Sequence, residues 1–312
     1  MIDSKIFLLV VLITTVFCAD TAVEEQDPVE FYLWDGSSAN LLTTDYSSIN
    51  PNGLTYFIVH GWTENATEVE YIQIAKNYKQ LHPKANVFLV DYRFLAAESY
   101  LEARSIVNKA GTAMGNRIVT MIKGNIIKLN KIHMFGHSLG THVCGKAAKI
   151  IKENMNNQRV PRISASDPAG PFFRLPLGLG IFDSLQESDA DFLDITHTSY
   201  DMGTIEAIGT VDTYVELLHG NQPACDGQFT EDALLFCNHR MARDYFTESI
   251  LSCGFLQRKR LLNITDAPTI IYGEHIPLNA SGIYFLDVNA KSPYAQSNPK
   301  CLKPSCIKKY FK

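Results

Sequence analysis

The sequence has no hydrophobic run long enough to cross a bilayer, no internal repeat, no low-complexity segment and no linker rich in glycine and serine. A transmembrane helix needs about 20 consecutive apolar residues, so no membrane span is expected. The formal net charge of −5 argues against a nucleic-acid-binding protein, because such proteins are usually basic. With 46% hydrophobic and 20% charged residues, the composition is that of an ordinary globular protein. We therefore expect a single domain over residues 19–312.

One short hydrophobic run stands near the N-terminus. Ile6–Phe17 contains 12 residues, which suits the central region of a secretory signal peptide and is too short to span a membrane. Small residues at positions 18 and 19 supply a cleavage point, so residues 1–18 are predicted to be a signal peptide and the protein to be secreted; a buried core segment is the alternative. Three glycosylation sequons fit a secreted protein, at Asn65, Asn263 and Asn279.

The cysteines lack the spacing of a zinc site, since there is no CxxC pair and no cluster of cysteine with histidine. Six cysteines follow residue 18, and an even count in a secreted chain indicates disulfides. Cys225 and Cys237 close a short loop and are the pair that we expect to be bonded. Cys144 lies in an apolar helical segment, where a buried free thiol is the alternative, so the other pairings stay open. No cofactor is predicted.

Strand-like and helix-like segments alternate from residue 54 onward. Expected strands are short runs of β-branched, aromatic and apolar residues, over 54–60, 86–91, 131–136 and 160–166. Expected helices cover 68–81, 98–122 with a break near Gly111, and 139–152. This order predicts an α/β fold with a mostly parallel sheet and helices on both faces. Irregular structure is expected over 20–30, and the chain is expected to be more irregular after Pro168.

The segment Lys131–Gly145, KIHMFGHSLGTHVCG, places a serine between an expected strand and an expected helix. The pattern G-x-S-x-G is weak alone, but this context is that of a nucleophile on a sharp turn. Gly136 and Gly140 remove Cβ atoms that would clash in the turn, so that the Ser138 hydroxyl stands clear of the sheet. The helix that follows directs its first N–H groups at the site, and the N–H of Leu139 is the expected donor to a developing oxyanion.

A serine nucleophile needs a base, and the base needs an orienting carboxylate. Asp167 comes directly after the expected strand 160–166, at the sheet edge where ligands bind in open α/β folds. His239 is the expected base, on a loop that a disulfide through Cys237 would anchor. His197, which follows the strand-like FLDIT, remains an alternative base on local grounds.

The end of the first strand supplies the remaining part of the expected site. His60 ends that strand and is expected to be structural, and the N–H of Trp62 is the expected second oxyanion donor.

These segments together resemble the animal pancreatic-lipase family of α/β-hydrolases, over roughly residues 50–295. The matching stretches are FIVHGW (57–62), NVFLVDY (86–92), GHSLGTHVCG (136–145), DPAGP (167–171), SDADFLDITHT (188–198) and CNHRMARDYFTESI (237–250). The resemblance implies an α/β-hydrolase fold and a Ser-His-Asp triad of Ser138, His239 and Asp167. It also implies backbone oxyanion donors at Trp62 and Leu139, and it favours His239 over His197.

The chain departs from the triglyceride lipases of that family. Too few residues follow His239 for their C-terminal β-sandwich domain, so neither that domain nor a colipase partner is expected. The family's lid lies between Cys225 and Cys237, and here it has only 11 residues, DGQFTEDALLF. So short a lid resembles the phospholipase A1 branch, as in insect venom phospholipases. Its apolar residues either contact lipid or pack onto the domain: Phe229, Leu234, Leu235 and Phe236.

Some pancreatic lipases hold a structural calcium just before the DADF stretch. Asp189 matches one ligand position, but Gln186 stands where another carboxylate is expected. We therefore predict no metal site.

Together these features predict a phospholipase A1 that cleaves the sn-1 ester of glycerophospholipids. A triacylglycerol lipase or a broad carboxylesterase is the alternative, and a non-catalytic lipid-binding or yolk-type protein is a remote one. The expected partner is a lipid substrate at an interface, with peripheral contact to a membrane surface, and the protein is expected to be monomeric.

Overall fold

The computed structural model describes residues 27–173, 184–216, 221–228, 230–259 and 269–297. The predicted signal peptide, the sequon at Asn263 and the lid residue Phe229 lie outside these ranges, so they stay predictions. No helix within the described residues has both the length and the apolar character needed to cross a membrane.

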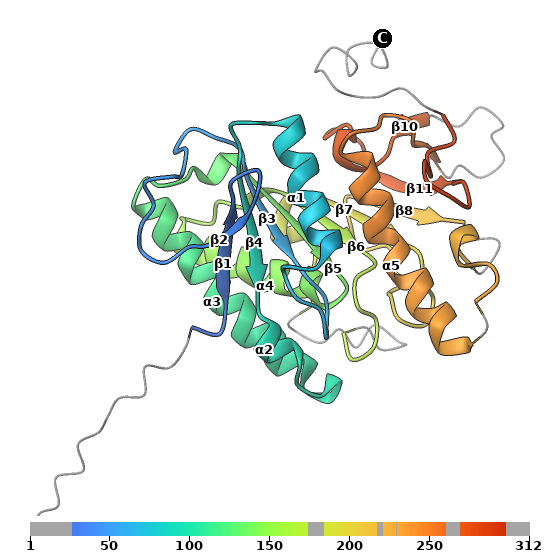
Figure 1. Cartoon of the computed structure of the whole chain (residues 1–312), viewed down its shortest axis with the longest axis horizontal. Helices are drawn as coiled ribbons and strands as arrows, with labels where there is room; N and C mark the ends of the chain where they lie inside the picture. Colours follow the sequence, from blue (N-terminus) through green and yellow to red (C-terminus); the bar gives the residue numbers. More distant parts are fainter. Residues whose placement is uncertain (1–26, 174–183, 217–220, 229, 260–268, 298–312) are drawn as a thin grey trace, which may run out of the picture.

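The described residues form one sheet with helices packed on it (Figure 1). Its strands are β1 Glu30–Trp34, β2 Ala39–Leu41, β3 Thr55–Val59, β4 Asn86–Asp91, β5 Ile132–His137, β6 Val160–Ser166, β7 Ala190–His197, β8 Val211–Val215, β9 Leu256–Lys259, β10 Thr269–Ile271 and β11 Gly282–Leu286. The α-helices are α1 Val69–Leu81, α2 Arg93–Ala96, α3 Ala103–Lys123, α4 Leu139–Asn154 and α5 Glu231–Ser249. The 3₁₀ helices are η1 Tyr100–Glu102, η2 Leu129–Lys131, η3 Glu187–Asp189, η4 Pro223–Cys225 and η5 Gly273–His275.

The strand order is β10-β9-β11-β8-β7-β6-β5-β3-β4-β1-β2. The seven strands from β11 to β4 pair in parallel, and the outer strands at both ends pair antiparallel. This is the expected α/β-hydrolase arrangement of a mostly parallel sheet flanked by helices. All four strands predicted between residues 54 and 166 are present.

Helices cover both faces of the sheet because its central strands are apolar on both sides. In β3, Phe57 and Val59 belong to the cluster formed with α3 and α4. The alternate residues Tyr56 and Ile58 belong to a second cluster, formed with α1 and the C-terminal part of α5. The alternation of side chains along a strand therefore builds two separate cores, one on each face.

The predicted break near Gly111 is wrong, because α3 runs through this residue without interruption. A Cβ at Gly111 would lie 2.5 Å from the Lys146 Cβ on α4, and one at Gly115 would lie 2.8 Å from the Ile150 Cβ. These glycines let α3 and α4 pack closely, and tertiary packing outweighs their low helix propensity.

Regular structure also forms within two segments that are expected from the sequence to be irregular or more irregular. The strand β1 begins at Glu30, the last residue of the expected lead-in, and pairs antiparallel with β4. Beyond Pro168 the chain adds the strands β7 to β11 to the sheet and the long helix α5. The strand β7 contains the strand-like FLDIT, whereas the shorter strands β8 to β11 are stabilised by pairing within the sheet, which their own sequences do not reveal.

Candidate active site

Ser138 stands in the turn between β5 and α4, with φ 53° and ψ −123°. A positive φ is strained for a residue with a Cβ, and such strain is concentrated at functional sites. The turn depends on two glycines. A Cβ at Gly136 would lie 2.7 Å from the carbonyl oxygen of Gly140, and a Cβ at Gly140 would collide with the carbonyl oxygen of His60. The expected strand–turn–helix geometry is therefore present, with β5 extending one residue further than expected, to His137.

The Asp167 carboxylate lies just past the C-terminal end of β6 and is fully buried. It accepts hydrogen bonds from His239 Nδ1 at 2.6 Å, from Ser199 Oγ at 2.5 Å and from the backbone N–H of Thr198 at 2.9 Å. A Cβ on Gly203 would collide with both carboxylate oxygens. The loop after β7 thus fixes the carboxylate and supplies donors that stabilise its charge.

His239 lies within helix α5, so the prediction that it sits on a loop is wrong. Its Nδ1 bonds Asp167, whereas its Nε2 is buried and has no hydrogen-bond partner within the described ranges of the chain. Ser138 and His239 line one cavity of about 240 Å³, together with Trp62 and Tyr100. A buried imidazole nitrogen without a partner, facing a cavity that also holds a serine hydroxyl, is the arrangement that a general base requires.

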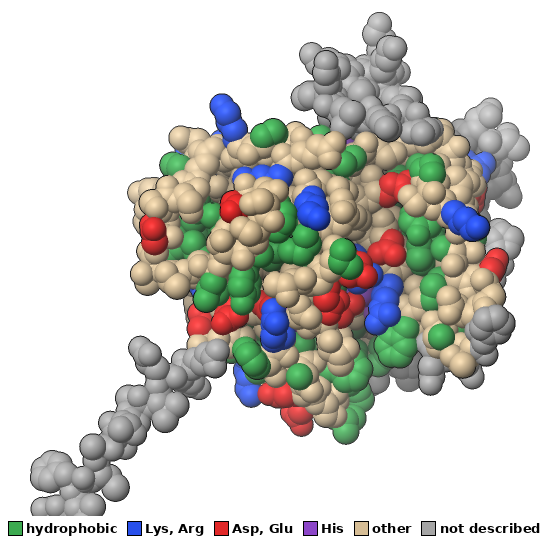
Figure 2. Space-filling view, in the orientation of Figure 1, with side chains coloured by type: hydrophobic (Ala, Val, Ile, Leu, Met, Phe, Trp, Pro, Cys, Tyr) green, Lys and Arg blue, Asp and Glu red, His purple; other side chains and the backbone are tan. Residues whose placement is uncertain are grey.

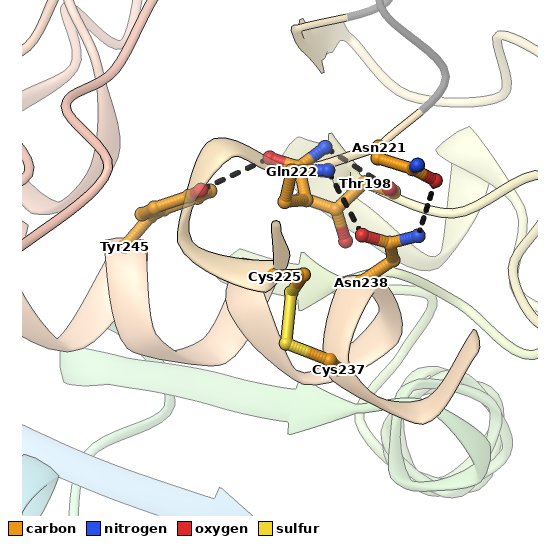
Figure 3. Close-up of a disulfide and its surroundings, with 7 residues drawn as sticks. All are labelled: Thr198, Asn221, Gln222, Cys225, Cys237, Asn238 and Tyr245. Carbon is orange, nitrogen blue, oxygen red and sulfur yellow. Dashed lines mark hydrogen bonds between the residues drawn. A yellow bond between two sulfur atoms is a disulfide. The ribbon is translucent and has the colours of Figure 1, made fainter. Parts of the chain in front are cut away.

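A disulfide and an amide network attach α5 to the loop that holds the carboxylate (Figure 3). Cys225 and Cys237 are bonded, as expected. Gln222 donates to the Thr198 carbonyl at 3.0 Å, and its backbone N–H donates to the Asn238 side chain at 2.8 Å. These bonds join the segment beside Asp167 to the residue that precedes His239, so they set the relative position of the two side chains.

The free thiol expected as an alternative is also present, because Cys144 is buried and not bonded. Cys253 is disulfide-bonded.

The lid segment is partly helical, which differs from the predicted 11-residue loop. The helix α5 begins at Glu231, so Leu234, Leu235 and Phe236 belong to its first turns. Phe236 lines the cavity beside Ser138 and is 39% exposed. Leu234 instead packs against a buried cluster of the domain. A capping hydrogen bond from the Ala233 N–H to the Thr230 hydroxyl starts the helix here.

The two expected oxyanion donors come from two separate elements, the start of α4 and the loop after β3. Leu139 is the first residue of α4, where helix geometry leaves a backbone N–H without an intrahelical acceptor. Trp62 lies on the loop after β3 and lines the cavity. Its indole Nε1 donates to the Glu98 carbonyl at 2.8 Å, and its ring packs edge-on against Tyr100. These contacts fix the backbone of the loop.

Sequence analysis missed a buried acidic residue that also lines the cavity, Glu64. Glu64 accepts hydrogen bonds from the Gly61 N–H at 2.8 Å, from the Tyr71 hydroxyl, and from Arg243 at 3.3 Å, and it lies 3.2 Å from His137 Nδ1. Burial works to raise the pKa of Glu64, but these neighbours hold the pKa below its ordinary value. The group links the loop after β3, the serine turn and α5. No local pattern marks it, because its partners come from separate elements.

The competing histidines have other partners. His197 Nδ1 lies 2.6 Å from the Thr204 carbonyl and its Nε2 lies 2.9 Å from Asp212, so both ring nitrogens are engaged. His60 stacks on Tyr92 and accepts a hydrogen bond from its backbone N–H, as a structural residue would.

The remaining predicted positions lie away from the cavity. The Asp189 carboxylate accepts a hydrogen bond from Lys149 at 2.8 Å, so this carboxylate is already paired with an ammonium group. Within the described residues, no group of acidic, histidine and cysteine side chains could hold a metal ion. Of the two described sequons, Asn279 is exposed, whereas Asn65 is half-buried and bonds Glu68.

A family model described as Lipase matches residues 26–257 of the chain. The chain belongs to the lipase family. It is 30% identical to Phospholipase A1 of Vespa crabro over 297 residues, which cover 89% of this chain and 94% of that protein. It is 28% identical to Lipoprotein lipase of Mus musculus over 224 residues, covering 65% of this chain and 45% of that protein. Among solved structures, a sugar hydrolase (YeeB) from Lactococcus lactis matches with a TM-score of 0.40 and 13% identity, over 71% of this chain and 92% of that chain. Membership of the lipase family makes the protein an ester hydrolase.

Proposed function

We propose that this lipase-family protein is a secreted phospholipase A1, which hydrolyses the sn-1 acyl ester of glycerophospholipids. The observation that carries the proposal is the state of His239: one ring nitrogen bonds Asp167, and the other is buried without a partner beside the cavity of Ser138. The likeness to proteins named Phospholipase A1 supports the choice of substrate.

In the proposed mechanism, the Ser138 hydroxyl attacks the carbonyl carbon of the sn-1 ester while His239 Nε2 takes its proton. The carbonyl oxygen becomes an oxyanion, which accepts hydrogen bonds from the N–H groups of Trp62 and Leu139. The His239 imidazolium, stabilised by Asp167, then donates its proton to the departing glycerol oxygen, and lysophospholipid leaves. A water molecule gives a proton to His239 and attacks the acyl carbon. The serine recovers its proton and the fatty acid is released.

The surroundings of the cavity suit contact with a lipid surface. Phe172 is 42% exposed and packs on Tyr100, which lines the cavity, while the neighbouring Leu101 is 77% exposed. Phe236, which also lines the cavity, adds a third exposed apolar side chain. Apolar side chains around a site bind the acyl region of an interface. The protein would therefore act at a membrane or micelle surface. We expect it to act as a monomer.

Hydrolysis of neutral lipid is a second candidate, because the chain also matches Lipoprotein lipase. The two candidates share the triad and differ in what lies beside the acyl chain: a polar head group or further acyl chains.

The test is hydrolysis of a phosphatidylcholine with different acyl chains at sn-1 and sn-2, in parallel with a triolein emulsion. Products are identified by mass spectrometry for the wild type and for Ser138→Ala. Release of the sn-1 chain alone, with little product from triolein and none from the variant, is the expected result. Fast triolein hydrolysis would make the protein a neutral-lipid lipase. Absence of product from both substrates would contradict catalysis on these lipids altogether.

A further inference from the structure

A second cavity, of about 600 Å³, adjoins the candidate active site. We call it the side cavity. Thr63, Phe236 and Arg240 line both cavities, so they form the boundary between them. Arg240 directly follows His239 in α5, which places it at the edge of the proposed reaction site. Figure 2 shows acidic, basic and hydrophobic side chains next to one another on this face, between α1 and the N-terminal part of α5.

Arg240 carries a positive charge that no carboxylate neutralises among the residues the structure describes. Its guanidinium is exposed and lies 5.7 Å from the centre of the Phe236 ring. Stacking on an aromatic ring orients a guanidinium and leaves its N–H donors free. Phosphate oxygens are among the best acceptors for such a group, because they can accept two parallel hydrogen bonds from it.

The other charged residues of the side cavity are mostly acidic. Arg243 is engaged with Glu64 at 3.3 Å, with Asp244 at 3.2 Å and with Glu70 at 3.9 Å. Glu64 lines the cavity of the candidate active site, whereas Glu70 and Asp244 line the side cavity. In this part of the side cavity the Arg243 guanidinium therefore faces two lining carboxylates, which leaves an excess of negative charge. The side chains of Glu70 and Asp244 are 41% and 34% exposed, so they are accessible to a ligand.

The order of charges along the side cavity complements a zwitterion. A group entering from the reaction site meets the Arg240 cation first and the acidic excess behind it. A phosphodiester linked to an ammonium group presents the opposite charges in the same order. An anionic head group without an amine would meet repulsion from Glu70 and Asp244.

We propose that the side cavity binds the head group of a zwitterionic phospholipid, with Arg240 on the phosphate and Glu70 facing the amine. This inference rests on the proposed phospholipase activity and names the head group that it acts on. Arg240 is then a specificity-determining residue, because a neutral ester offers it no anion.

The first test compares two monomeric substrates that carry the same esters: dihexanoylphosphatidylcholine and dihexanoylglycerol. The measured quantity is the ratio of their kcat/KM values. Arg240→Gln is expected to lower this ratio about tenfold, because a charge-assisted hydrogen bond to the phosphate is lost. Arg159→Gln is the matched control, since Arg159 is an exposed arginine before β6, at the opposite edge of the sheet from Ser138. This control is expected to leave the ratio unchanged.

The second test measures inhibition of dihexanoylglycerol hydrolysis by glycerophosphocholine, glycerol 3-phosphate and inorganic phosphate. Glycerophosphocholine is expected to inhibit the wild type most strongly, and its Ki is expected to rise about tenfold in Arg240→Gln. Glu70→Gln should weaken inhibition by glycerophosphocholine and strengthen inhibition by glycerol 3-phosphate. Equal inhibition by all three would indicate a general anion site and would overturn the zwitterion assignment.

The outcomes separate the two proposals. If the wild type releases sn-1 chains but Arg240→Gln leaves both the ratio and the Ki unchanged, the head-group site is wrong and the phospholipase activity stands. If the wild type hydrolyses only the neutral ester and glycerophosphocholine does not inhibit it, both proposals fail. Melting temperatures of the variants, measured beside the kinetics, identify any loss that comes from misfolding.

Discussion

Two of the buried histidine–aspartate pairs in the described part of the chain lie on neighbouring parts of the same sheet, and they differ in one respect. His239 and Asp167 are joined at 2.6 Å, and His197 and Asp212 at 2.9 Å. The second nitrogen of His197 lies 2.6 Å from a backbone carbonyl, so both ring nitrogens have partners; we call this the closed pair. The second nitrogen of His239 has no hydrogen-bond partner among the described residues, and His239 lines a cavity.

This difference teaches that pairing with a carboxylate does not identify a base. Both pairs are buried and both are well hydrogen-bonded, so burial and pairing alone fit a structural role equally well. What separates them is the unsatisfied nitrogen, because leaving a buried polar atom without a partner costs free energy that a purely structural site would avoid.

Removing each imidazole in turn should give the largest contrast. His239→Gln is expected to lower kcat by about 10⁴-fold or more, because no base remains for Ser138. His197→Gln is expected to keep kcat within about tenfold of the wild type and to lower stability by about 1–3 kcal/mol, because Asp212 loses a buried partner. Ester hydrolysis and thermal melting of both variants check this, and the reverse pattern would exchange the roles of the two pairs.

The two aspartates provide the next contrast. Asp167→Asn removes the charge that orients and stabilises the His239 imidazolium, and we expect kcat to fall by about 10⁴-fold with the fold retained. Asp212→Asn should alter the melting temperature more than kcat. Comparable losses of kcat in the two variants would mean that the closed pair also takes part in catalysis.

Substitution of the buried Glu64 tests whether its charge stabilises the surroundings of the His239–Asp167 pair. Its pKa is held below the ordinary value, so its contribution to stability is present above about pH 4.5 and is lost as the pH falls towards the lowered pKa. Glu64→Gln should therefore be less stable than the wild type near neutral pH, by about 1–3 kcal/mol. Denaturant titrations at several pH values should show the gap narrowing below pH 4.5. A gap that stays constant would mean that the Glu64 charge contributes nothing.

Ser199 offers the smallest effect. Its hydroxyl donates to Asp167 at 2.5 Å and is one of several donors to that carboxylate. Ser199→Ala should lower kcat about tenfold without changing KM, since it removes one charge-assisted hydrogen bond far from the bound lipid. Ser199→Thr, which keeps the hydroxyl, should recover most of the activity. A change confined to KM would assign Ser199 to substrate binding instead.

The first half of the fold could be predicted from sequence because its signals are local. The strands β3 and β4 are short, mostly apolar runs, and the turn at Ser138 is marked by glycines that its geometry requires. The second half could not, since β9, β10 and β11 depend on pairing with distant strands. The same holds for the site: Ser138 and Asp167 follow recognisable strands, whereas Glu64 and Ser199 act through contacts across the fold.

The choice between His239 and His197 also lay beyond local sequence. Both histidines follow plausible segments, and the structure distinguishes them by the partners of their second ring nitrogens and by the place of His239 in the cavity of Ser138. The placement of His239 on a helix was missed because the cysteine before it suggested a disulfide-anchored loop. In the structure, the disulfide Cys225–Cys237 holds the helix itself.

The most direct test of the central claim is labelling with a fluorophosphonate, which reacts only with an activated serine. Wild type, His239→Gln, His197→Gln and Ser138→Ala would be labelled in parallel, and the modified peptide identified by mass spectrometry. The expected result is a label on Ser138 in the wild type and in His197→Gln, with labelling abolished in the other two variants. Labelling that survives in His239→Gln and disappears in His197→Gln would contradict the account.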